Sequence, residues 1–185
     1  MLIRTEAPAE YGIVEKIHER AFAGNKEAGV VRAVRESVGY RPEWSLVCED
    51  SGHLAGHVVF SHVGLEDDEG NTQCIVVLAP LAVLPEKQRR GVGSALVLRG
   101  IGLLESASVP LVVVRGDLAY YGRFGFQPST EVGVRAPFPV DEDHYLAKRL
   151  PLYTTDFRGV VRYPATFGAV GYEAQWNYPP QRAEQ

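Results

Sequence analysis

The hydrophobic positions near the start of the chain recur at helical spacing. In residues 11–23, Ile13, Ile17 and Ala21 stand four apart with charged side chains between them, which predicts an amphipathic helix. The same periodicity over residues 26–38 predicts a second helix. Its inward side is formed by three valines: Val30, Val31 and Val34. Two helices are therefore expected before the first strand.

Apolar and β-branched residues then come in the shorter runs that are typical of strands. Residues 45–50 and 54–65 are separated by a short turn signal and predict a hairpin. Residues 73–84 are so uniformly apolar that we expect a central strand buried on both faces. A helical stripe over residues 91–107 and an apolar run at 110–117 follow. Strand, helix and strand in this order predict a right-handed crossover between parallel strands.

The last third of the chain carries weaker signals. Three shorter segments predict further strands or edge elements: residues 132–138, 144–152 and 157–164. A strand near 157–163 would lie at a sheet edge, and such an edge offers a surface for a homodimer. The C-terminal aromatic side chains are expected to pack these strands, with an acceptor pocket or a dimer contact as alternatives: Tyr153, Phe157, Tyr163, Phe167, Tyr172 and Trp176.

The length and composition fit one packed domain. The 185 residues are 45% hydrophobic and 23% charged, values typical of globular proteins. No linker-like shift in composition divides them, so residues 1–185 are expected to form a single α/β domain. Its core would cover about residues 2–150, with added strands and a tail at 151–185.

The net charge, the hydropathy and the cysteines narrow the range of possible partners and ligands. The formal net charge of -4 argues against nucleic acid as a partner. No apolar run approaches the roughly 18 residues that span a bilayer, and the start of the chain has no leader pattern. We therefore expect a cytoplasmic protein without a membrane partner. Cys48 and Cys74 lie far apart in apolar segments, which predicts two buried thiols and no metal site.

The segment AVLPEKQRRGVGSAL, residues 82–96, places two arginines and two glycines where a helix is expected to begin. Unpaired N–H groups and the helix dipole favour anions at such a point, and glycines leave the approach open. The lysine of a nucleotide-binding P-loop is missing, and Leu96 occupies the place of the third glycine of the dinucleotide fingerprint. The local chemistry therefore predicts a phosphate or pyrophosphate at residues 88–94.

These residues carry a resemblance to a known family. LAVLPEKQRRGVGSALV resembles the coenzyme A binding motif of the GNAT superfamily of N-acetyltransferases, and residues 88–93 match every position of that motif. GDLAYYGRFGFQP, residues 116–128, resembles a second segment of the same family, in which a tyrosine stands five residues before the phenylalanine of a Gly-Phe pair. The resemblance implies a central, bent, mixed β-sheet flanked by helices, and acetyl-CoA as cosubstrate with no metal.

The resemblance also implies which residues bind the cofactor. Its central strand would open near Pro80 and pair with the pantetheine arm, while the turn and helix start would bind the phosphates. Pro80 agrees with this on physical grounds, because it lacks the N–H that would continue a ladder. The implied cofactor-binding residues are Leu81, Ala82, Val83, Gln88, Arg89, Arg90, Gly91, Val92, Gly93, Ser94, Tyr120 and Phe124.

Catalytic roles follow from the same resemblance and from proton chemistry. Tyr121 would be the general acid that protonates the departing thiolate, with Tyr120 as the alternative. An amine of pKa near 10.4 must lose a proton before it attacks, so a base is also needed. Three residues are candidates for that base: Glu27, His57 and His62. Asp117 precedes the two tyrosines and is expected to cap the following helix.

The sequence thus predicts an N-acetyltransferase that moves an acetyl group from acetyl-CoA directly to a primary amine of a small molecule or peptide. Neither cysteine lies in a motif that supplies a covalent nucleophile. The alternative is a sensor or scaffold with the same fold that binds an acyl-CoA without turnover.

Overall fold

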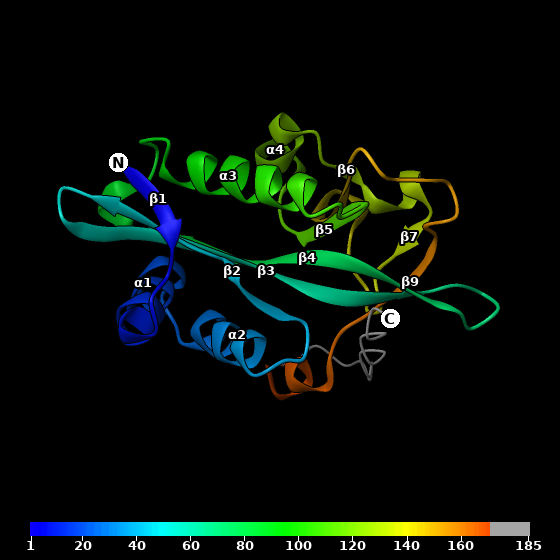
Figure 1. Cartoon of the computed structure of the whole chain (residues 1–185), viewed down its shortest axis with the longest axis horizontal. Coiled ribbons are helices and arrows are strands. Elements are labelled where there is room, and N and C mark those ends of the chain that lie inside the picture. Colours follow the sequence, from blue (N-terminus) through cyan, green and yellow to red (C-terminus); the bar gives the residue numbers. More distant parts are fainter. Residues whose placement is uncertain (171–185) are drawn as a thin grey trace, which may run out of the picture.

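The computed structural model describes residues 1–170 and consists of helices on both faces of one mixed sheet (Figure 1). The strands are β1 (Leu2–Thr5), β2 (Tyr40–Asp50), β3 (His53–Glu66), β4 (Thr72–Val83), β5 (Leu111–Arg115), β6 (Gln127–Pro128), β7 (Val134–Arg135), β8 (Tyr145–Arg149) and β9 (Gly159–Arg162). The α-helices are α1 (Tyr11–Phe22), α2 (Lys26–Arg35), α3 (Val92–Ser106) and α4 (Leu118–Tyr121). The predicted mixed α/β class is confirmed.

The sheet has the strand order β1-β2-β3-β4-β5-β8-β6, with β9 paired to β3 and β7 paired to β9. The predicted β2–β3 hairpin is antiparallel, and β4 and β5 are parallel neighbours joined through α3, as expected. Figure 1 places α3 and α4 on one face of the sheet and α1 and α2 on the other. The sheet therefore separates two distinct layers of core.

Alternate residues of β4 enter these two layers, which is why the strand reads as a continuous apolar run. Val76 and Leu78 pack in the cluster under α3, whereas Ile75 and Val77 pack in the cluster on the opposite face. The predicted burial on both faces is confirmed. Gly100 of α3 is needed for this packing, because a Cβ at that position would lie 2.1 Å from Cε2 of Phe60.

The prediction for the buried side of α1 was wrong. Ile13, expected to face inward, is 52% exposed, and the buried residues of this helix are Val14, Ile17 and His18. The expected apolar stripe and the observed buried face share Ile17. The apolar pattern could not distinguish the two faces, because the buried face includes a histidine, His18. The face of α1 that meets the sheet is therefore partly polar.

Several smaller expectations need correction. β1 was not expected at all, since four residues are too few for a periodicity argument. β9 is not a free edge, because Val160 is paired with Glu66 of β3 on one side and with Arg135 of β7 on the other. The edge that suggested a homodimer is thus occupied, and the homodimer stays a prediction.

The expected packing of the C-terminal aromatics holds for those that the structure describes. Tyr163 and Phe167 are buried in the cluster on the α2 face, and Tyr153 and Phe157 pack against it. Tyr172 and Trp176 lie outside the described residues. In residues 1–170, no helix is long and apolar enough to cross a bilayer.

The two thiols differ in environment. Cys48 is fully buried, as expected. Cys74 is only partly buried, because it lies at the outer end of β4, and its Sγ is 3.0 Å from Nδ1 of His62. The described residues contain no group of three or more His, Cys, Asp or Glu side chains that could hold a metal ion.

Candidate functional site

β4 and β5 separate part-way along their length. Their pairing runs from Val76 with Val112 to Leu78 with Val114, while β4 continues along β3 as far as Val83. The register between β3 and β4 shifts at this point, so that Ala79 and Pro80 together stand where β3 supplies one residue. Such a bulge turns a strand away from its neighbour. The opening predicted near Pro80 is therefore present.

A cavity of about 1220 Å³ lies at this opening. The end of β5 and the turn after it form one wall, and β4 from Val77 to Leu81 forms another. Phe22 at the end of α1 and the first residues of α2 close a third side. Its polar and ionisable lining residues are Lys26, Glu27, Arg115, Asp117, Tyr120, Tyr121, Asp141, His144 and Tyr163.

A second cavity of about 630 Å³ adjoins the first and faces the start of α3. Its lining residues are Leu81, Val83, Gln88, Arg89, Gly91, Gly93, Ser94, Tyr120 and Arg123. The described lining contains two arginines and no acidic side chain. With the N-terminus of a 15-residue helix at its wall, this smaller cavity is suited to an anion.

The turn before α3 has the conformation that glycine makes accessible. Gly91 has φ 83°, and Arg89 also takes a left-handed conformation, with φ 57°. Gly93 lies directly against the hydroxyl of Tyr120, because a Cβ there would be 2.6 Å from that oxygen. The two glycines therefore serve different purposes: one makes the turn, and the other admits an aromatic side chain.

The structure places eight of the twelve predicted cofactor-binding residues on the smaller cavity. Four do not line it: Ala82, Arg90, Val92 and Phe124. Ala82 is buried and pairs with His57 of β3, and Val92 and Phe124 pack in the core under α3. Arg90 is exposed to solvent. The side-chain amide of Gln88 donates to the carbonyl oxygen of Val83 at 3.1 Å and is already engaged.

Arg123 is a lining residue that the sequence analysis missed. Its guanidinium carbon lies 4.1 Å from the ring centroid of Tyr120 and 4.9 Å from that of Phe124. Stacking on an aromatic face leaves the edge of the guanidinium free for hydrogen bonds. Its place three residues after one cavity-lining tyrosine was the signal that could have found it.

The two tyrosines occupy different positions. Tyr120 and Leu81 are the described residues that line both cavities. Tyr121 lines the larger cavity, is 8% exposed, and covers Gly116 so closely that a Cβ there would be 2.3 Å from its Cε2. Burial raises the pKa of Tyr121, so its phenol stays protonated at neutral pH. Asp117 caps α4, accepting a hydrogen bond from the N–H of Ala119 at 2.8 Å, as predicted.

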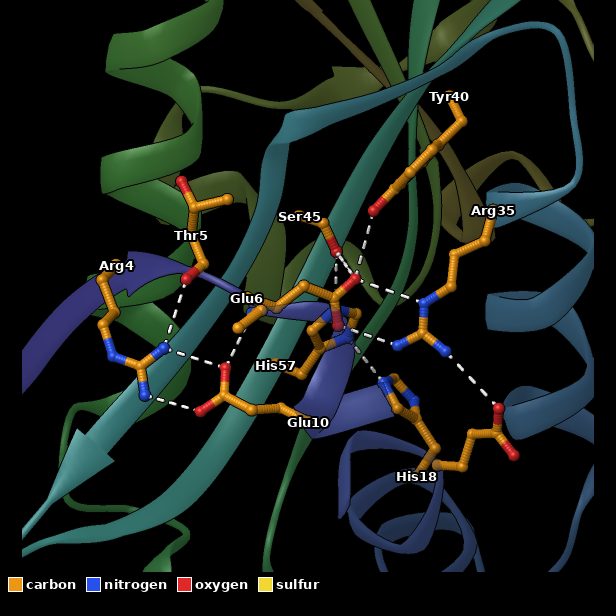
Figure 2. Close-up of polar contacts among 11 residues, drawn as sticks. Arg4, Thr5, Glu6, Glu10, His18, Arg35, Tyr40, Ser45 and His57 are labelled. Atoms are coloured by element: carbon orange, nitrogen blue, oxygen red, sulfur yellow. Dashed lines mark hydrogen bonds and ion pairs between the residues drawn. The ribbon is translucent and has the colours of Figure 1, made fainter. Parts of the chain in front are cut away.

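Of the three candidate bases, Glu27 lines the larger cavity and the two histidines do not. His62 lies next to Cys74 and Trp44 on β4 and β2, and burial lowers its pKa to about 4. His57 is fully buried, and burial lowers its pKa to about 3, with the nearby Arg35 acting in the same direction. Figure 2 shows His57 within a buried polar cluster between α1 and the sheet. The structure thus brings only Glu27 to the cavity.

The family is shown by comparison with known proteins. A family model described as an acetyltransferase (GNAT) domain matches residues 3–129. The chain belongs to the GNAT acetyltransferase family. As a member of it, the protein is an N-acetyltransferase that depends on acetyl-CoA, as predicted.

Relatives from Escherichia coli agree with this assignment. The chain is 36% identical over 132 residues to the uncharacterized N-acetyltransferase YjhQ of strain K12, covering 71% of this chain and 72% of that protein. It is 33% identical over 150 residues to the uncharacterized N-acetyltransferase YhbS of strain K12, covering 81% and 87%.

Solved structures agree as well. A crystal structure of YhbS from Escherichia coli in complex with CoA has a TM-score of 0.78 at 31% identity, over 90% of this chain and 91% of that one. A GNAT acetyltransferase from Brucella melitensis in complex with acetyl-CoA has a TM-score of 0.72 at 29% identity, over 90% and 97%. The GNAT fold is thereby confirmed.

Proposed function

We propose that this GNAT protein transfers the acetyl group of acetyl-CoA directly to a primary amine of a small molecule or peptide. The observation that carries the proposal is the junction of two cavities at Leu81 and Tyr120. The smaller, cationic cavity would hold the phosphates, and the larger one would hold the amine. The thioester would then lie between them, at the opened edge of β4.

The cofactor would be held in two ways. The pantetheine arm carries amide groups, which can pair with the backbone of Leu81 and Val83 in the way an added strand would. The phosphates would lie at the start of α3, near Gly91, Gly93 and Ser94. Arg89 and Arg123 would donate charge-assisted hydrogen bonds to them.

The reaction would proceed in the larger cavity. The amine nitrogen attacks the thioester carbon, and collapse of the tetrahedral adduct breaks the carbon–sulfur bond. The phenol of Tyr121 gives its proton to the departing thiolate, while Glu27 accepts the proton lost by the amine, directly or through water. No covalent bond to the protein forms in this scheme.

The experiment that tests the function measures thiol release from acetyl-CoA in the presence of amines. The purified protein would be assayed with spermidine, kanamycin and a lysine-containing peptide as probes. Amine-dependent release of CoA thiol together with a matching gain of 42 Da on the amine, the mass that an acetyl group adds, is the expected result, because acylation requires both. Tight acetyl-CoA binding without turnover of any amine would favour the sensor instead.

Arg89→Ala and Arg123→Ala are each expected to weaken acetyl-CoA binding by about tenfold or more, since a charge-assisted hydrogen bond contributes about 1.5–3 kcal/mol. Arg90→Ala is expected to have a smaller effect, because Arg90 does not line the smaller cavity. Calorimetric titration measures all three. Arg99→Ala, an exposed position on α3, controls for the loss of one positive charge, and an equal loss of affinity there would contradict the assignment.

A further inference from the structure

A line of buried polar side chains crosses the sheet under α1 (Figure 2). Glu6 follows β1, Ser45 lies on β2, His57 on β3 and His18 on α1. Ser45 Oγ is 2.5 Å from Oε1 of Glu6 and 2.9 Å from Nε2 of His57. Nδ1 of His57 is 2.9 Å from Nε2 of His18. All four residues are at least nine-tenths buried. The line thus runs from one edge of the sheet towards the opened part of β4.

The charge of Glu6 fixes the direction of the first two hydrogen bonds in this line, and the neutral state of His57 fixes the third. Arg35 donates to Oε1 and Oε2 of Glu6 at 3.2 and 2.8 Å, which is the pairing of a guanidinium with an ionised carboxylate. A carboxylate only accepts, so the hydroxyl of Ser45 must donate to it. The oxygen of Ser45 then accepts from Nε2–H of His57. Burial lowers the pKa of His57 to about 3 and keeps the ring neutral, so its Nδ1 has no proton and accepts from Nε2–H of His18. Both histidines thus carry a proton on Nε2.

The line of hydrogen bonds ends at the unprotonated Nδ1 of His18. In this tautomer Nδ1 of His18 is an acceptor, and it is buried without a hydrogen-bond partner among the described residues. Burial lowers the pKa of His18 to about 2, with His57 and Arg35 adding to the effect, so the ring stays neutral. Among the described residues, the hydrogen bond from Nε2–H of His18 to His57 is therefore the one polar bond that joins this side chain to the sheet.

His18 lies one helical turn before Phe22, which lines the larger cavity, where the amine is proposed to bind. The rings of His18 and Phe22 are stacked, with centroids 6.3 Å apart and planes 7° from parallel. Phe22 ends α1, is 45% exposed and lines the larger cavity. Glu27 and Lys26 follow on the first turn of α2 and line the same cavity. A displacement of His18 would therefore move Phe22, and with it the wall of the larger cavity.

We propose that Glu6, Ser45, His57 and His18 form a directed hydrogen-bond chain that fixes the end of α1, and with it Phe22, at the amine-binding cavity. His57 and His18 are then positioning residues, and they set the affinity for the amine without touching acetyl-CoA. This inference rests on the proposed function for the identity of the amine side. The direction of the chain and its hold on α1 do not depend on turnover.

The first test reads the direction of the chain. In ¹⁵N-resolved histidine spectra of the whole protein at pH 7, both His18 and His57 are expected as Nε2–H tautomers with an unprotonated Nδ1. An Nδ1–H signal from either residue would reverse the chain and overturn the proposal. This measurement needs no substrate, so it stays decisive even where no amine is acetylated.

The second test compares two replacements of His57. The amide of His57→Gln can accept from His18 and donate to Ser45, whereas His57→Leu can do neither. Amide exchange over residues 18–22 is expected to rise about tenfold or more in His57→Leu and to stay within about twofold of the wild type in His57→Gln, because a lost buried bond promotes local opening. Glu19→Gln, an exposed neighbour on α1, is the matched control and is expected to change nothing.

Steady-state kinetics complete the test with whichever probe amine is acetylated. His57→Leu is expected to raise KM for the amine about tenfold and to leave KM for acetyl-CoA unchanged, with His57→Gln close to wild type in both. If His57→Leu does not fold, Ser45→Ala removes only the hydroxyl that joins Glu6 to His57 and is read in the same way. Equal effects on both substrates, or failure of His57→Gln to restore protection of α1, would overturn the proposal.

Discussion

Tyr121→Phe is expected to lower kcat for acetyl transfer about 10²- to 10⁴-fold, the range that a general acid commonly contributes. Phenylalanine keeps the ring that packs on Gly116 and removes only the hydroxyl, so the fold should be unaffected. Because burial raises the pKa of Tyr121, the phenol arrives protonated and can give its proton to the thiolate. Thiol release at saturating acetyl-CoA and amine measures the effect.

Tyr120→Phe is the matched control for this prediction. Tyr120 lines both cavities, and its hydroxyl lies over Gly93 beside the cationic turn. We expect its replacement to change acetyl-CoA affinity more than kcat. A larger loss of kcat in Tyr120→Phe than in Tyr121→Phe would exchange the two roles.

The second large effect concerns acid stability. Burial lowers the pKa of His18 to about 2 and of His57 to about 3, whereas an unfolded histidine titrates near 6.5. Between these values the unfolded chain binds more protons than the folded one, so stability is fully present above pH 6.5 and is lost as the pH falls. Each histidine contributes about 1.4 kcal/mol per pH unit in this window.

The two histidines together should therefore reduce the free energy of unfolding by about 5 kcal/mol between pH 6.5 and 4.5, a large share of the stability of an ordinary domain. Urea unfolding at a series of pH values measures the slope. His57→Gln removes one titrating group and keeps its hydrogen bonds, so about half of the slope should disappear. His53→Gln, at an exposed histidine, should leave the slope unchanged, and an unchanged slope in His57→Gln would contradict this origin.

The sequence could predict those parts of the fold in which a local pattern of residues is compatible with only one structure. β4 is apolar on both faces and is bounded by a polar turn and a proline, so its central place followed from composition. The glycines and arginines at 88–93 also predicted an anion site at the start of α3, where the smaller cavity lies, because few chemistries need that combination at a helix start.

The missed features depend on distant parts of the chain. His18 reads as a polar position on a helix, and only its partner on β3 explains why it is buried. Arg123 reads as a surface charge until α4 brings it beside the turn at Arg89. His57 was a candidate base by residue type, yet its neighbours occupy both ring nitrogens. Chemistry of this kind is set by tertiary contacts, which no periodicity records.

β1 has a practical consequence for work on this protein. The strand is four residues long, pairs with β2 alone, and leads directly into Glu6, whose carboxylate meets Ser45 and Arg35. A purification tag or a shortened start would therefore act on the one strand that delivers this carboxylate to the interior. Any N-terminal tag should therefore be removed before kinetic measurements, so that it does not disturb the pairing of β1 with β2 or the position of Glu6.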